Sequence, residues 1–287
     1  MTTATAAPVA PPRSGWWIIA RLTIREAVSR RLVLAAAVLS VGFIALFATG
    51  LLLLTNRADF GIIDTAAASV LASLGLYALH FLTAFLALLI GAGSIAADID
   101  SGALHALLAR PITRRAYLLG RWAGLVLLLA TYVTAMGSAI IWIAAVIADY
   151  SPLSATRTLL LLVFEAVLLL TVAVLGSTRL STVANGVAVF CLFSVAWIGG
   201  FIEAIGEALT NTAMTNLGIA VSLLMPSDAL WRGASYYSQS AALIAQSGGE
   251  IPFLGGAPPA PSMLAWSALV VVGSLLLALR WFGRRDL

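Results

Sequence analysis

The sequence predicts an all-α membrane protein with six transmembrane helices, and three observations support this fold class. Of the 287 residues, 61% are hydrophobic and only 10% are charged, and the mean hydropathy of +1.04 lies outside the usual range of soluble domains. The hydrophobic residues fall into stretches of about 20 or more, which lets a helix cross about 30 Å of hydrocarbon. Barrel strands would instead alternate over about ten residues. Because hydrocarbon satisfies no backbone polar group, each long stretch must be a helix.

The first 31 residues precede the first hydrophobic stretch. Residues 1–15 are rich in Ala, Thr and Pro and predict a disordered tail without the hydrophobic core of a signal peptide. Residues 16–31 alternate hydrophobic with charged side chains, which predicts an amphipathic helix on the membrane surface. Arg21, Arg25 and Glu26 are among its charged residues. Residues 16–287 are expected to form a single transmembrane domain.

Six spans are expected, so both chain ends lie on the same side of the membrane. If that side is the cytoplasm, thirteen of the sixteen arginines lie there and only Arg57, Arg157 and Arg232 lie outside, as the positive-inside rule requires. The Ala-rich composition without lysine is consistent with a GC-rich bacterial genome, and a bacterial plasma membrane is the expected location. The expected spans are 32–54, 68–97, 121–148, 157–177, 183–202 and 263–282.

Two segments outside the membrane are long enough to have a role of their own. The first, 98–120, is cytoplasmic, and the second, 203–262, is extracytoplasmic. Within the second, 213–225 is hydrophobic but too short to span, which favours an interfacial or re-entrant helix. Pro226 ends that helix, and a mixed helix is expected over 229–245.

The sequence excludes several classes of active site. The chain has no lysine, so it cannot contain the phosphate-binding loop that ends in Lys-Ser or Lys-Thr. Cys191 is the only cysteine, and His80 and His105 lie in different segments, which excludes a cysteine cluster and a His-Glu-x-x-His zinc pair. No catalytic residue, metal site or cofactor is therefore expected. The pI near 9.7 would suit nucleic acid, but the arginines gather at the membrane boundaries, which indicates membrane lipid instead.

Two features inside the predicted spans are candidates for a specific role. Glu165 is the only acid well inside a span. It is either a proton or cation site with His80 as its partner, or a protonated or hydrogen-bonded side chain that fixes helix packing. Gly120 and Gly124 form a small-xxx-small pair that would let two helices approach closely.

The cytoplasmic segment between the second and third spans predicts a short amphipathic helix between two breaks. Asp98 and Asp100 lie near its start, where acids interact favourably with the helix N-terminus, and Pro111 ends it. Three leucines share one face, which either contacts lipid or docks into a groove of a partner protein: Leu104, Leu107 and Leu108.

This segment resembles the coupling region of type-2 ATP-binding-cassette (ABC-2) permeases. The shared order is acid-x-acid-x-Gly-x-Leu, then Leu-Leu-x-x-Pro-x-x-Arg and Leu-Leu-Gly-Arg. Aspartates replace the glutamates that are commoner in that family, and Arg121 stands where the family often has lysine. The matching residues are Asp98, Asp100, Gly102, Leu104, Leu107, Leu108, Pro111, Arg114 and Gly120.

The resemblance covers nearly the whole chain: an amphipathic helix, six spans, an outer helical insertion before the sixth span and a typical ending at 284–287. Part of the insertion is similar to a subgroup that serves nitrous-oxide-reductase maturation and to multidrug-type exporters. That part comprises Met225, Pro226, Ser227, Asp228, Trp231 and Arg232.

The resemblance implies the membrane-spanning subunit of an ATP-driven exporter, without an enzymatic activity of its own. Two copies would form a homodimer and bind two separate nucleotide-binding subunits, which hold the ATP and Mg²⁺. These subunits would dock on the coupling segment and on the amphipathic helix, and the second and fifth spans would line a groove between the copies. The residues implied in coupling are Asp98, Asp100, Gly102, Leu104, Leu107, Leu108, Pro111, Arg114 and Arg115.

Two other functions stay open at this point. A proton-coupled secondary carrier would use Glu165 and would transport without a partner. A membrane scaffold would transmit the motion of an ATPase to an extracytoplasmic partner bound at 203–262.

Overall fold

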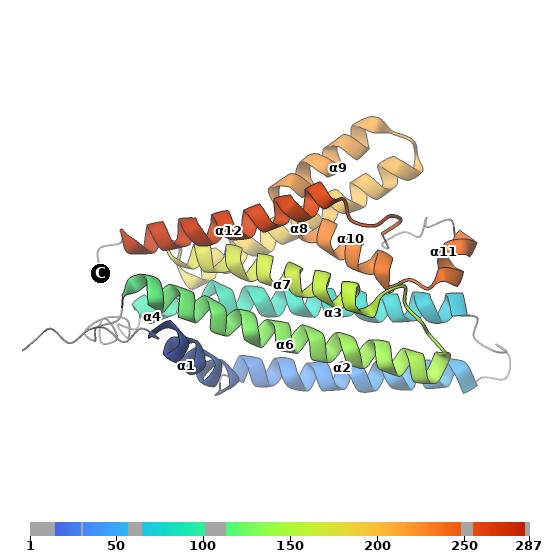
Figure 1. Cartoon of the computed structure of the whole chain (residues 1–287), viewed down its shortest axis with the longest axis horizontal. Helices are drawn as coiled ribbons and strands as arrows, with labels where there is room; N and C mark the ends of the chain where they lie inside the picture. The colour runs from blue at the N-terminus through green and yellow to red at the C-terminus, as the bar shows by residue number, and fades with distance from the viewer. Residues whose placement is uncertain (1–14, 30, 57–64, 101–112, 248–254, 285–287) are drawn as a thin grey trace, which may run out of the picture.

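The computed structural model describes residues 15–29, 31–56, 65–100, 113–247 and 255–284, and these form a bundle of long helices that run side by side (Figure 1). The beginning of α1 and the end of α12 lie at one end of the bundle, the basal end, and the opposite end is the distal end (Figure 1). The helices are α1 (Gly15–Ser29), α2 (Arg31–Asn56), α3 (Thr65–Ala92), α4 (Ala96–Asp100), α6 (Arg114–Ala148), α7 (Ala155–Ser177), α8 (Thr182–Ala208), α9 (Thr212–Leu224), α10 (Ser227–Ser238), α11 (Ala241–Ser247) and α12 (Pro261–Gly283).

Six spans are long and hydrophobic enough to cross a membrane among the described residues, which confirms the predicted fold class. They are α2, α3 together with α4, α6, α7, α8 and α12. Two helices extend beyond the predicted spans. α6 begins at Arg114 instead of 121, and α8 continues to Ala208 instead of ending at 202. Charged residues interrupt the hydropathy pattern in both places, yet Arg114 is hydrogen-bonded to the carbonyl of Gly283 and Glu203 is ion-paired with Arg232.

The central helix of the bundle is α7. It contacts α3, α6, α8, α10 and α12, and half of its most hydrophobic window is buried. By contrast α2 and α12 are mostly exposed, and the side chains that they expose are largely leucine and valine. Exposed hydrophobic helices of this length are what hydrocarbon requires of a membrane protein.

The basal ends of α3, α7 and α8 are joined by the side chain of Asn185, which is fully buried. Its amide nitrogen donates to the carbonyl oxygens of Ala92 in α3, at 3.1 Å, and Ala173 in α7, at 2.7 Å. Gly176 provides the space, because a Cβ at that position would lie 2.8 Å from the Cγ of Asn185. One amide thus fixes three spans relative to one another.

The helix predicted over 16–31 corresponds to α1, and it packs along α6. Its buried residues form one stripe on the face toward the bundle: Ile19, Ala20, Thr23 and Ala27. A Cβ at Gly124 of α6 would lie 2.7 Å from the carbonyl oxygen of Ala20. The small-xxx-small pair therefore brings the backbones of α1 and α6 together. The membrane-surface location of α1 stays a prediction, and the tail predicted at 1–15 lies, apart from Gly15, outside the described residues.

The insertion before the last span begins with a close hairpin of α8 and α9. A Cβ at Gly218 of α9 would lie 2.7 Å from the carbonyl oxygen of Gly199 in α8. α9 and the end of α8 project together from the rest of the bundle (Figure 1). The chain then bends by 106° between α9 and α10, and α10 turns back into the bundle, where it contacts α3, α7 and α8.

The single helix predicted over 229–245 is split into α10 and α11. Between them Gln239 and Ser240 use their backbone groups for tertiary contacts. The carbonyl of Gln239 accepts from the N–H of Leu153 at 2.9 Å, and the N–H of Ser240 donates to the hydroxyl of Ser69 at 2.8 Å. These bonds to distant segments replace the helical ones, which sequence periodicity alone does not reveal.

Replacing Gly124 by leucine is expected to push α1 off α6, because the added side chain would overlap the α1 backbone at a cost of about 1–3 kcal/mol or more. The measurement is maleimide labelling of Ala27→Cys, a position that is 5% exposed, in a Cys191→Ser background. Labelling should be slow with Gly124 and fast in Gly124→Leu. Gly273→Leu in α12, where a Cβ meets nothing within 4 Å, is the control, and equal labelling in all three proteins would contradict the packing described.

Candidate functional site

The densest group of charged contacts at the basal end centres on Arg121 in α6. Its guanidinium binds Glu26 of α1 with both Nη atoms, at 2.5 and 3.4 Å, and lies 3.1 Å from the carboxylate of Asp98 in α4. The residue is only 8% exposed. A planar guanidinium suits this two-pronged geometry, which a lysine could not reproduce. The two acids and the arginine connect α1, α4 and α6, and we call them, with Tyr117 and Ser94, the basal cluster.

The third contact of Arg121 depends on the turn between α3 and α4. In a continuous helix the N–H of Asp98 would bond to the carbonyl of Ser94. Here it bonds to the carbonyl of Ile95 instead, at 3.1 Å, and the Ser94 carbonyl accepts from Nε of Arg121 at 2.9 Å. The break in the span therefore creates the acceptor that holds the arginine.

Tyr117 lies one turn before Arg121 and supports the same carboxylate. Its hydroxyl donates to Asp98, and its ring stacks on Phe282 of α12 with centroids 5.9 Å apart. The stacking connects the basal cluster to the last span as well. At the start of α6, the hydroxyl of Thr113 caps the helix by accepting from the N–H of Ala116 at 3.2 Å.

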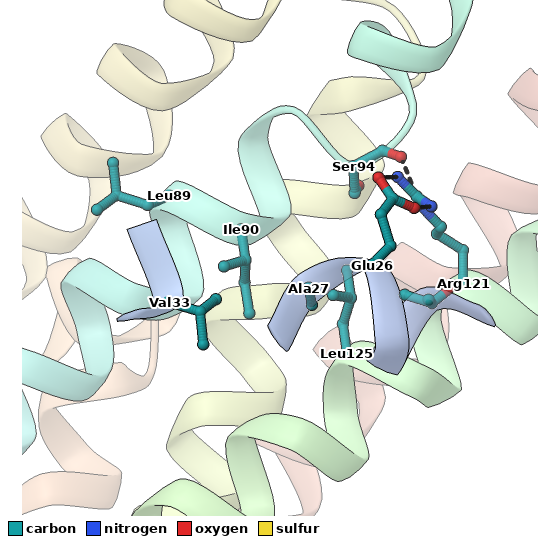
Figure 2. Close-up of a pocket in the computed structure, with 9 residues that line it drawn as sticks. Glu26, Ala27, Val33, Leu89, Ile90, Ser94, Arg121 and Leu125 are labelled. Carbon is teal, nitrogen blue, oxygen red and sulfur yellow. Dashed lines mark hydrogen bonds and ion pairs between the residues drawn. The ribbon is translucent and has the colours of Figure 1, made fainter. Parts of the chain in front are cut away.

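A small cavity of about 20 Å³, enough for one water molecule, lies beside the cluster. Figure 2 shows Glu26 and Arg121 facing each other at its rim, with the Ser94 carbonyl above them. Side chains of α1, α2, α3 and α6, most of them hydrophobic, form the rest of the wall, so the ion pair is shielded on this side. The lining residues are Thr23, Glu26, Ala27, Val33, Leu89, Ile90, Ser94, Arg121 and Leu125.

Further arginines surround the cluster. Arg21, Arg25 and Arg115 are exposed, and Arg114 donates to the carbonyl of Gly283 at 3.4 Å. Arg179 lies over the ring of Trp281, 5.6 Å from its centroid. The basal end therefore presents a positively charged surface. No group of three or more potential metal ligands exists in the part of the chain that the structure describes.

The structure brings some of the predicted coupling residues together and does not describe others. Glu26 and Asp98, predicted in separate segments, meet on the same arginine, and Arg114 lies beside the end of α12. Asp100 is the last residue of α4, and nothing is described of its side chain. Arg115 is exposed on α6. The other predicted coupling residues lie outside the described residues: Gly102, Leu104, Leu107, Leu108 and Pro111. The role of these residues in coupling stays a prediction.

The second predicted pair is in contact. Nδ1 of His80 in α3 lies 2.7 Å from Oε1 of Glu165 in α7, and the two side chains are 1% and 2% exposed. They lie near the middle of their helices, away from the basal cluster. Sequence reasoning missed the organising role of Arg121 and an ion-pair group on α10. Its Asp228 and Arg232 are four residues apart, a spacing that predicts a helical ion pair.

Comparison with known proteins gives one match and one negative result. A family model described as ABC-2 family transporter protein matches residues 17–287. No curated protein matches the chain. The match spans α1 to α12 and includes the whole basal cluster.

Replacing Arg121 by glutamine is expected to destabilise the protein by about 2 kcal/mol or more, because Glu26 and Asp98 would lose their cation in a largely buried place. The measurement is the apparent melting temperature in mild detergent, together with labelling of Ala27→Cys as a report on α1. Arg115→Gln, at an exposed position of the same helix, should change stability by less than about 0.5 kcal/mol. A melting temperature of Arg121→Gln equal to that of Arg115→Gln would show that the cluster contributes nothing.

Proposed function

Because the chain belongs to the ABC-2 transporter family, we propose that it is the membrane-spanning permease subunit of an ATP-driven exporter and works as a homodimer with two separate nucleotide-binding subunits. The observation that carries the proposal is the family match over residues 17–287. The chain has no lysine and hence no phosphate-binding loop with Lys-Ser or Lys-Thr. In this proposal ATP and Mg²⁺ belong to the partner subunits.

The distribution of arginines supports a cytoplasmic basal end. Of the arginines that the structure describes, all but Arg157 and Arg232 lie at or near that end. An excess of arginine beside the ends of spans marks the cytoplasmic side. Both termini would then be cytoplasmic, in a bacterial plasma membrane, and α9 to α11 would lie toward the extracytoplasmic side.

The proposed docking site of the nucleotide-binding subunits combines segment 101–112 with α1. The basal cluster supports this combination, because Asp98 lies three residues before that segment and shares Arg121 with Glu26 of α1. A displacement of segment 101–112 would therefore move α4 and α1 together. The bond of Tyr117 to Asp98 and its stacking on Phe282 would transmit the movement to α12.

The proposed translocation groove lies between the α3–α8 faces of two copies. Phe85 of α3 and Phe190 of α8 stack with centroids 5.9 Å apart, and they are 47% and 43% exposed. Neighbouring Leu89 and Val187 are exposed too. A hydrophobic wall of this kind favours hydrophobic or lipid-like cargo.

Purification of the tagged chain from its own cells in mild detergent is expected to recover a nucleotide-binding subunit in about equal amount. Gly102→Arg should abolish this recovery without preventing membrane insertion, because a long charged side chain would occupy the docking segment. Ala213→Arg, at an exposed position of α9 near the other end of the chain's bundle, is the matched control and should keep the partner. Absence of any ATPase with the unmodified chain would contradict the proposal.

A further inference from the structure

Five ionisable side chains gather in the distal half of the bundle, where the proposed function gives them no role. They come from four helices and form two groups. We call them the distal cluster: His80 in α3, Glu165 in α7, Glu203 in α8, and Asp228 and Arg232 in α10.

The inner group is the pair of His80 and Glu165. Both side chains are almost fully buried, and their atoms lie 2.7 Å apart. Aromatic rings enclose the imidazole, among them Phe81 and Trp231 with centroids 4.9 and 5.0 Å away. Within the described residues neither ring nitrogen of His80 has a hydrogen bond of good geometry. Such a place gives a charge little solvation, so an ionised group there needs a charged or hydrogen-bonding partner.

The outer group consists of one cation between two acids. The guanidinium of Arg232 lies 2.7 Å from Glu203 through Nη2 and 3.1 Å from Asp228 through Nε. Asp228 packs against the α8 backbone, since a Cβ at Gly200 would lie 2.7 Å from its Oδ1. The side chains of Asp228 and Glu203 are 7% and 11% exposed, so both carboxylates are largely removed from water.

The two groups are close enough to affect each other. Trp231, next to Arg232 in α10, touches His80, and the carboxyl of Asp228 interacts with the charges of both His80 and Glu165. Tyr77 of α3 packs on Trp231 with centroids 5.1 Å apart and is bonded to Trp197 of α8. The five side chains therefore form one electrostatic unit across α3, α7, α8 and α10.

The charges of this unit do not balance. It holds three carboxyl groups, one guanidinium and one imidazole. Even with His80 fully protonated, three carboxylates face two cations, and with His80 neutral they face one. Among the described residues, Glu207 adds a further acid close to Arg232. An uncompensated charge in a poorly solvated place is strongly unfavourable, and the group neutralises by binding a proton instead.

We propose that the distal cluster is a proton-binding site, which holds one exchangeable proton beyond those of its ion pairs. Uptake forms an O–H bond on a carboxylate oxygen of Asp228 or Glu165, and release breaks the same bond and returns the proton to water. The inference concerns this chain alone and does not depend on an ATPase partner.

A route for the proton exists beside Asp228. A cavity of about 30 Å³ offers room for one or two water molecules. It borders both the carboxylate and the guanidinium, so a water there can pass a proton to the cluster. The lining residues are Tyr77, Trp197, Gly200, Phe201, Ala204, Asp228, Trp231 and Arg232.

The behaviour of Asp228 agrees with this site. Burial raises the pKa of its carboxyl to about 6, while Arg232 and His80 oppose the rise and Glu165 and Glu203 add to it. An acid with a raised pKa binds its proton more tightly in the folded state, so the protonated form stabilises the fold as the pH falls through about 6. Loss of the proton leaves a surplus negative charge between α10 and its neighbours α7 and α8. This charge weakens the packing of α10 against them.

The test is infrared spectroscopy of the full chain in lipid nanodiscs, titrated from about pH 9 to about pH 5.5. The band of a protonated carboxyl group separates from the amide and carboxylate bands and identifies itself by its shift in D₂O. We expect about one such group per chain to appear as the pH falls. In Asp228→Asn one acid is gone, two carboxylates face the guanidinium and the imidazole, and the titrating band should disappear. In Arg232→Gln the surplus grows, and the band should persist to higher pH.

Asp149→Asn, at an exposed position between α6 and α7, is the control and should leave the titration unchanged. Glu165→Gln is a second variant that balances the charges, should Asp228→Asn fail to fold. Absence of a titrating carboxyl band in the unmodified chain would overturn the proposal, whatever the variants do. The same is true of a band that titrates identically in the unmodified chain, Asp228→Asn, Glu165→Gln and Arg232→Gln.

Discussion

The basal half of the structure depends on the ion pairs and hydrogen bonds of the Arg121 guanidinium. It lies at the point where α1, α4 and α6 meet, and each of its three nitrogens has a separate acceptor. A cation in this position is expensive to desolvate, and the cost is offset only because both acids and a backbone carbonyl surround it. The carbonyl is available because the span of α3 and α4 is interrupted at residues 93–95. A local break in one helix, a close approach through Gly124 and a buried arginine are thus parts of one arrangement.

The two polar clusters differ in a way that fits their different positions. In the basal cluster one guanidinium faces two acids, but Glu26 is 41% exposed on its side chain, so water compensates the second acid. In the distal cluster the acids are largely buried, and only a small cavity borders Asp228 and Arg232. The charges of the basal cluster are compensated, so it holds its helices together at all times. The distal cluster keeps a surplus negative charge, which a bound proton neutralises. ATP-driven movement at one end and proton exchange at the other would meet in α3 and α7, which reach from the basal to the distal half.

Most of the fold was predictable from the sequence, because length and hydropathy determine which segments cross a membrane. The exceptions are all charged or polar residues with distant partners. Arg121 and Glu203 look like the ends of spans, yet ion pairs keep them inside longer helices. Gln239 and Ser240 read as helical, but bonds to Leu153 and Ser69 end α10.

The candidate sites show the same limit of sequence reasoning. Glu26 and Asp98 were predicted individually from composition and resemblance. Their common partner was not, because nothing in a pattern shows that positions 26, 98 and 121 converge. The pairing of His80 with Glu165 was one of two alternatives for Glu165, because an acid in hydrocarbon needs a partner or a proton. The surplus charge around them depends on α10 folding back into the bundle, which a 106° bend produces.

The central claim is that the basal cluster makes α1, α4 and α6 move as one body when ATP is used. The most direct measurement is the distance between spin labels at the exposed positions 25 in α1 and 115 in α6, in a Cys191→Ser chain bound to its ATPase, with and without ATP. The account predicts one narrow distance distribution that ATP leaves unchanged, and a broad distribution once Arg121 is replaced by glutamine. A distance that changes with ATP while Arg121 is intact would show that α1 moves independently of α6 and would contradict the account.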